Sequence, residues 1–156
     1  MSNPRRIHII PHFLFKNPDT LIGGSANLMF NEILASGDKE ATLISRFKYD
    51  TPDGLLANCI NINAPLLVKT IPFIRDIYFV VRALQRVKRA ARQEDAVCLD
   101  IHVGLYEYIP VFLVMFKLLQ VNCLTTISLY CPPPNTIATK VIMYVIRKDS
   151  ALKLRA

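Results

Sequence analysis

Apolar, strand-like runs alternate along this chain with longer segments of helical periodicity, and this alternation constrains the fold more than any other feature. The predicted strands are 7–13, 41–45, 59–62, 96–101 and 123–129, and the predicted helices are 24–35, 65–92 or 72–92, 106–119 and 136–147. Because strand and helix alternate and the strands are apolar, the pattern predicts a parallel sheet with helices on both faces. Right-handed crossovers make this a Rossmann-like, three-layer α/β structure.

Length and charge limit what such a chain can do. Its 156 residues are enough for a single domain, 1–156, with a proper core. The net charge of +7 favours an anionic partner, such as a phosphorylated small molecule, an acidic lipid surface or a nucleic acid. No run reaches the roughly 18 uncharged apolar residues of a membrane span. We therefore predict a cytoplasmic protein that can attach peripherally to the inner face of the cell membrane.

The cysteines indicate neither a metal site nor a redox motif. Cys59, Cys98, Cys123 and Cys131 are scattered and form no CxxC pair. We expect them to be buried, reduced thiols. Since no other ligand cluster is visible, we predict no metal and no cofactor.

Polar side chains follow the apolar strands at the points where the strands end. Asp100 and His102 close the fourth strand on one face, about 7 Å apart along the chain. This spacing suits a histidine that works beside a carboxylate in acid–base catalysis, and it equally suits a hydrogen-bonded pair that only ends a strand. His12 ends the first strand, and Ser128 and Tyr130 end the fifth. All five are expected at the carboxyl edge of the sheet, where open α/β sheets bind ligands.

Gly23 and Gly24 open the first predicted helix. Backbone N–H groups at a helix start, with no Cβ in the way, can bind phosphate or carboxylate. An ordinary turn explains the pair about as well, and the spacing is not that of a GxGxxG dinucleotide fingerprint.

Four arginines form one narrow stripe on the long helix: Arg75, Arg82, Arg86 and Arg89. The opposite face is apolar and is expected to pack on the sheet; it comprises Phe73, Ile77, Val80, Val81, Leu84 and Val87. An arginine-rich stripe favours contact with anionic lipid head groups. Nucleic-acid phosphates would fit the charge, but no aromatic residues are interleaved with it. We therefore predict a membrane-surface contact and no nucleic acid.

Several of these motifs, in this order, are familiar. Gly23-Gly24 opening a helix, then Ala35-Ser36-Gly37 and a strand at 41–44, resembles the start of GT-B fold glycosyltransferases, in particular the large retaining family with a Gly-Gly loop. The run 96–102 is similar to a later strand of that family, which often ends in histidine. The run 125–130, followed by Pro132, is similar to the next strand and its proline-bearing loop. The likeness covers nearly the whole chain through short motifs.

The resemblance implies the N-terminal, acceptor-binding half of an enzyme that transfers a sugar from a nucleotide sugar to a lipid-linked or polysaccharide acceptor, usually without a metal. It implies that His102 and Asp100 line the acceptor cleft as catalytic candidates. Gly23 and Gly24 would approach the acceptor or the donor phosphates. In the family, a histidine near the end of the fifth strand contacts the donor sugar, whereas this chain has Ser128, Leu129 and Tyr130 there.

The family's second Rossmann-like domain, with the donor site and its paired glutamates, is expected to lie outside this chain. The chain is then expected to be inactive alone and to use a nucleotide sugar only when a second domain or subunit is supplied. The alternative is a non-catalytic membrane-surface or partner-binding module derived from the same fold. A small nucleotide-binding α/β protein of another kind is a third possibility.

Overall fold

The computed structural model describes residues 5–11, 32–33, 35–38, 40–46, 58–93, 96–103, 108–130 and 134–155. Its strands are β1 Arg5–Ile10, β2 Thr42–Ser45, β3 Asn58–Asn61, β4 Val97–Val103, β5 Leu124–Leu129 and β6 Leu152–Arg155. Its helices are α2 Leu66–Lys69, α3 Pro72–Gln93, α4 Tyr108–Leu118 and α5 Ile137–Lys148. The predicted strands and helices that fall on described residues are thus present, with ends that shift by a few residues.

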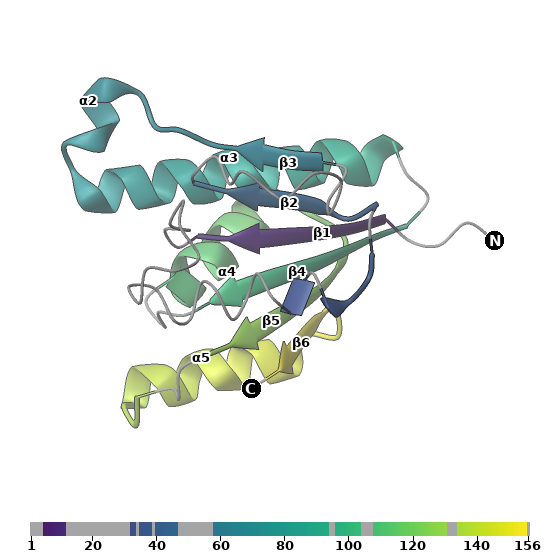
Figure 1. Cartoon of the computed structure of the whole chain (residues 1–156). Helices are drawn as coiled ribbons and strands as arrows, with labels where there is room; N and C mark the ends of the chain where they lie inside the picture. Colours follow the sequence, from purple (N-terminus) through teal and green to yellow (C-terminus); the bar gives the residue numbers. More distant parts are fainter. Residues whose placement is uncertain are drawn as a thin grey trace.

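The strands form one six-stranded, all-parallel sheet in the order β3-β2-β1-β4-β5-β6 (Figure 1). This confirms the predicted Rossmann-like α/β arrangement. The direction in which strands are added reverses between β1 and β4. In open α/β sheets, ligands bind outside the carboxyl ends of the strands at such a reversal.

One face of the sheet carries the apolar core. Side chains of alternate strand residues, such as Ile7, Leu99 and Ile127, pack there against α3, α4 and α5. Figure 1 shows α3 and α4 along the same side of the sheet. The contributing helix residues include Phe79, Val80, Ala83, Leu84, Val87, Ile109, Phe112 and Ile146.

The other face of the sheet is more polar near its centre. Because side chains alternate along a strand, Arg6 and His8 of β1 share this face with Asp100 and His102 of β4. A helical segment at Glu32 reaches the same region. This face therefore carries the histidine and the carboxylate that the sequence singles out.

Of the two predicted starts of the long helix, Pro72 is confirmed, and a separate short helix precedes it. α2 ends at Lys69 and α3 begins at Pro72, which occupies a first-turn position where proline needs no backbone hydrogen bond. The first turn of α3 extends past the carboxyl ends of the strands (Figure 1). Phe73 is consequently 66% exposed, and its predicted packing against the sheet is wrong.

β6 is absent from the predicted elements. Leu152 is buried on the sheet and alternates with two cationic residues, Lys153 and Arg155. The strand lies at the edge of the sheet and pairs with β5. Such a short edge strand has few apolar positions, so its charges dominate the pattern.

Gly37 confirms the predicted end of the first helix. Its φ of 68° lies in the left-handed region that glycine adopts without a Cβ penalty.

The described cysteines are free thiols, but the prediction that they are buried is wrong. Cys59 is exposed, and Cys98 and Cys123 are half-buried. Cys131 lies outside the described residues. Within the described ranges, no helix is long and apolar enough to cross a membrane.

Candidate functional site

The polar residues on the face that carries His8 and His102 gather where the strand order reverses. Register pairs His8 of β1 with Asp100 of β4, and His102 of β4 with Ser128 of β5. Both histidines are almost fully buried, at 4% and 5% exposure, and Ser128 is buried as well. The parallel pairing of β1, β4 and β5 thus fixes the backbone positions of the whole cluster.

A chain of hydrogen bonds runs across these strands. Nδ1 of His8 lies 3.0 Å from Nε2 of His102. Nδ1 of His102 lies 2.8 Å from the Tyr130 hydroxyl, which donates to Oε2 of Glu32 at 2.6 Å. The chain links β1, β4, the end of β5 and the helical segment at Glu32.

The protons in this chain have one consistent arrangement. Tyr130 has a single hydroxyl proton and donates it to Glu32, so its oxygen must accept from Nδ1–H of His102. A neutral His102 then presents a lone pair at Nε2, which accepts from Nδ1–H of His8. Nε2 of His8 is left as a buried lone pair without a hydrogen-bond partner among the described residues.

Burial keeps both imidazoles neutral. Burial, followed by the effects of His8 and Arg155, lowers the pKa of His102 to about 3. It also lowers the pKa of His8, against the opposing effect of Asp100. Burial, together with the hydrogen bond to Glu32, raises the pKa of Tyr130, which stays protonated at neutral pH.

Asp100 lies beside His8, which is hydrogen-bonded to His102. Its Oδ2 lies 3.7 Å from Nδ1 of His8 and 3.7 Å from Nε of Arg6. The hydrogen bonds of His102 go to His8 and Tyr130. The predicted side-by-side pair of Asp100 and His102 is therefore replaced by a cluster in which His8 links the two.

These properties favour binding over proton abstraction. A general base works best when its pKa is close to the working pH, and the pKa of His102 is far below neutrality. A fixed neutral imidazole is instead a directional hydrogen-bonding group. We interpret His102 as a positioning residue that aligns Tyr130 and His8.

Three predicted site residues, His12, Gly23 and Gly24, lie outside the described residues. His8, Arg6 and Glu32 are members of the cluster that were not predicted as site residues. The sequence indicates His8 as well, because strand alternation places it on the same face as Arg6. Glu32 gave no such signal, since only the tertiary fold brings it to Tyr130.

The arginine stripe divides in two. Arg82, Arg86 and Arg89 are exposed along α3. Arg75 is more buried, and its Nε lies 3.5 Å from the Asp76 carboxylate. Its side chain lines a cavity together with Arg46 and Lys69.

No group of three or more His, Cys, Asp or Glu residues within the described part of the chain could hold a metal ion. Comparison with protein-family models, with curated proteins and with solved structures found no match.

Because His102 is buried as a neutral imidazole, we predict that the folded state loses stability in acid. His102 has a pKa near 6.5 when unfolded and about 3 when folded, so below pH 6.5 only the unfolded chain takes up its proton. Stability should therefore fall as the pH drops, by up to about 1.4 kcal/mol per pH unit for this group. Urea unfolding of the wild type and of His102→Gln between about pH 6.5 and 5, above most carboxyl pKa values, measures the effect. The variant should show the shallower slope, and equal slopes would contradict a neutral buried His102.

Proposed function

We propose that this chain is the acceptor-binding domain of a GT-B type glycosyltransferase and holds a sugar acceptor at the carboxyl ends of β1, β4 and β5. The observation that carries the proposal is the hydrogen-bonded chain from the buried, neutral His8 and His102 to Tyr130, which lies across the strand reversal. Fold topology says where ligands of open α/β sheets bind, and the polar cluster occupies that place. The reaction class, transfer of a sugar, is proposed from the short motifs that resemble GT-B glycosyltransferases.

The chemistry of the cluster suits hydroxyl groups. A sugar hydroxyl both donates and accepts hydrogen bonds, so it matches a site in which donors and acceptors are fixed in direction. Asp100 and Tyr130 are only partly buried, so their carboxylate and phenol are the groups of the cluster that we propose contact the acceptor. Polar groups placed in this way supply orientation and specificity in ligand sites.

In this proposal the nucleotide-sugar donor is held by a second Rossmann-like domain or subunit. The present chain fixes the acceptor hydroxyl in position to attack the sugar, and this positioning is its contribution to the rate. His102 acts by holding Tyr130 and His8, and the low pKa of His102 argues against its taking the proton of the acceptor.

Acceptor binding can be measured directly by saturation-transfer difference NMR, using a panel of free oligosaccharides and short-chain polyprenyl-phosphate sugars. We expect at least one compound to bind, and Tyr130→Phe to weaken it about tenfold through loss of one hydrogen bond. Tyr144→Phe, the same change at an exposed position of α5, is the matched control and should have no effect. If no sugar compound binds, or if Tyr130→Phe binds like the wild type, the proposal is contradicted.

A second candidate is a non-catalytic membrane-surface module, favoured by the exposure of Arg82, Arg86 and Arg89. Their guanidinium groups lie on the solvent side of α3, while the buried side of the helix packs on the sheet. Each basic residue near an acidic bilayer contributes about 1 kcal/mol to binding. Peripheral attachment is also compatible with an enzyme whose acceptor is lipid-linked.

Cosedimentation with phosphatidylglycerol vesicles tests this contact. Replacing Arg82, Arg86 and Arg89 together by glutamine should weaken binding on the order of a hundredfold at low salt. The matched triple lysine variant keeps the charge and should bind nearly as well as the wild type. If wild type and glutamine variant partition alike, the three arginines are only a solvated helix face.

A further inference from the structure

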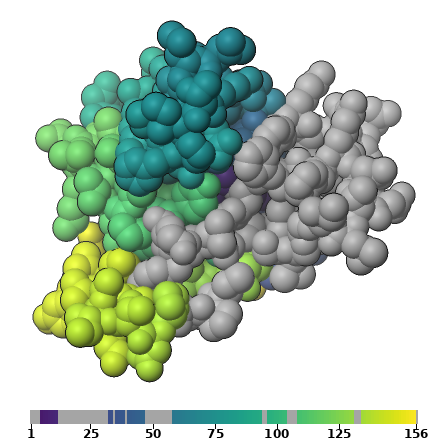
Figure 2. Space-filling view, turned by 90° about the vertical axis from the view of Figure 1, so that its left-hand side faces the viewer, coloured from purple at the N-terminus to yellow at the C-terminus, as the bar shows by residue number. Residues whose placement is uncertain are grey.

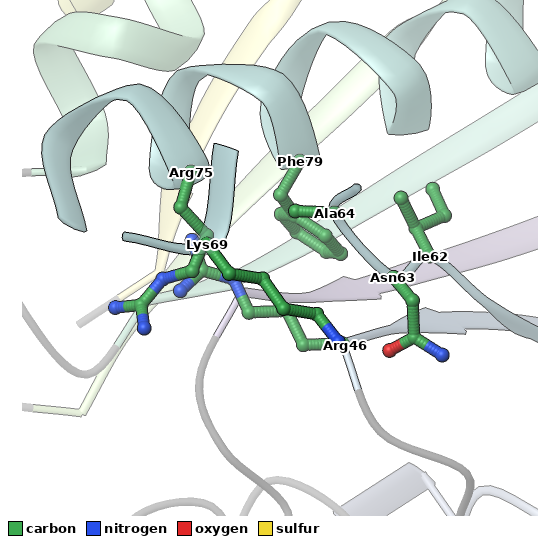
Figure 3. A pocket seen from close by; sticks show the side chains of 7 residues that line it. All are labelled: Arg46, Ile62, Asn63, Ala64, Lys69, Arg75 and Phe79. Carbon is green, nitrogen blue, oxygen red and sulfur yellow. The ribbon is translucent and has the colours of Figure 1, made fainter. Parts of the chain in front are cut away.

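A cavity lies on the opposite side of the sheet, the side on which α3 packs. It is a cavity of about 250 Å³ lined by Arg46, Ile62, Asn63, Ala64, Lys69, Arg75 and Phe79. Arg46 directly follows β2, and residues 62–64 directly follow β3, so the cavity opens at the carboxyl edge. Figure 3 shows the three cationic side chains reaching it from the end of β2, from α2 and from α3, beside the ring of Phe79.

The cavity brings three cations together, Arg46, Lys69 and Arg75. Its described lining residues include no carboxylate, and Asp76 lies beside Arg46 and Arg75, so the group keeps a net positive charge. Arg46 is buried, donates to Oδ1 of Asp76 at 2.5 Å and lies 5.1 Å from the centre of the Phe79 ring. Such a held guanidinium loses little freedom when it binds an anion, and its planar fork matches phosphate oxygens.

Apolar side chains surround the mouth of the cavity. α2 carries Lys69 toward the cavity and also presents Leu66 and Leu67, which are 83% and 87% exposed. Phe73 and Ile74 in the next turn are exposed as well. In Figure 2, which views the edge on the left of Figure 1, α2 and the start of α3 (teal) form a raised part of the surface.

We propose that the Arg46–Lys69–Arg75 pocket binds the phosphate group of a membrane lipid while Leu66 and Leu67 insert among its hydrocarbon chains. A phosphate is attracted by the positive charge of the three cations, and hydrocarbon chains cover apolar side chains that otherwise face water. Cations and exposed leucines on one short helix are the combination that interfacial membrane contacts use. The proposal is independent of the sugar acceptor, because Arg46 and His8 lie on opposite sides of the sheet.

Isothermal titration calorimetry with dihexanoyl phosphatidic acid, kept below its micelle concentration, tests the pocket without a membrane surface. Glycerol 3-phosphate serves as the head group alone. We expect saturable binding of one phosphatidic acid per chain and at least tenfold weaker binding by Lys69→Gln/Arg75→Gln. Arg86→Gln/Arg89→Gln removes the same charge from exposed positions of α3 outside the pocket and should bind like the wild type.

The leucines provide the second arm of the test. Leu66→Ser/Leu67→Ser should weaken phosphatidic acid binding and leave glycerol 3-phosphate binding unchanged. Circular dichroism melts establish that each variant is folded. If Lys69→Gln/Arg75→Gln does not fold, the single variant Lys69→Gln, at an exposed position, replaces it in the binding measurement.

Three results would overturn the proposal. The first is no binding of phosphatidic acid. The second is equal loss of binding in Lys69→Gln/Arg75→Gln and in Arg86→Gln/Arg89→Gln, which would indicate that surface charge alone binds the lipid. The third is glycerol 3-phosphate binding as tightly as phosphatidic acid, which would assign the pocket to a soluble phosphate compound.

Discussion

The hydrogen bond between His8 and His102 joins the two strands at which the sheet reverses its order, and the polar site depends on it. Burial of the two imidazoles side by side favours the neutral form of both, since removing a charge from water is costly. Because Tyr130 donates its proton to Glu32, a neutral His102 carries its proton on Nδ1, and a neutral His8 donates from its own Nδ1 to His102. Tyr130 thereby connects the sheet to Glu32.

The two faces of the sheet carry different groups of side chains near the same carboxyl edge. On the helix-covered face, apolar strand residues build the core and hold α3, whose first turn carries Arg75 beyond the strands. On the other face, His8, His102 and Tyr130 form the hydrogen-bonded chain that we propose as a site for hydroxyl groups. A sugar acceptor carried on a lipid phosphate would have chemistry for both sites, which is why we propose an acceptor-binding domain at a membrane surface.

Much of the fold could be predicted from local pattern, because each central strand is an apolar run with a helical segment after it. The cluster of Asp100, His102 and Tyr130 was likewise predictable, since parallel strands end at a common edge. Features that depend on tertiary position were missed. β6 is an edge strand masked by its charges, Phe73 lies on a helix turn that overhangs the sheet, and Glu32 meets Tyr130 only through the fold.

The central claim is that His8 and His102 are neutral and donate in sequence toward Glu32. Two-bond ¹⁵N–¹H correlation spectra of the imidazole rings test it most directly, because ring nitrogen shifts report both charge and tautomer. At neutral pH we predict that His8 and His102 are both neutral with the proton on Nδ1, and that His102 keeps this form well below pH 6.5. A proton on Nε2 of His102, or an imidazolium at either residue at neutral pH, would contradict the account.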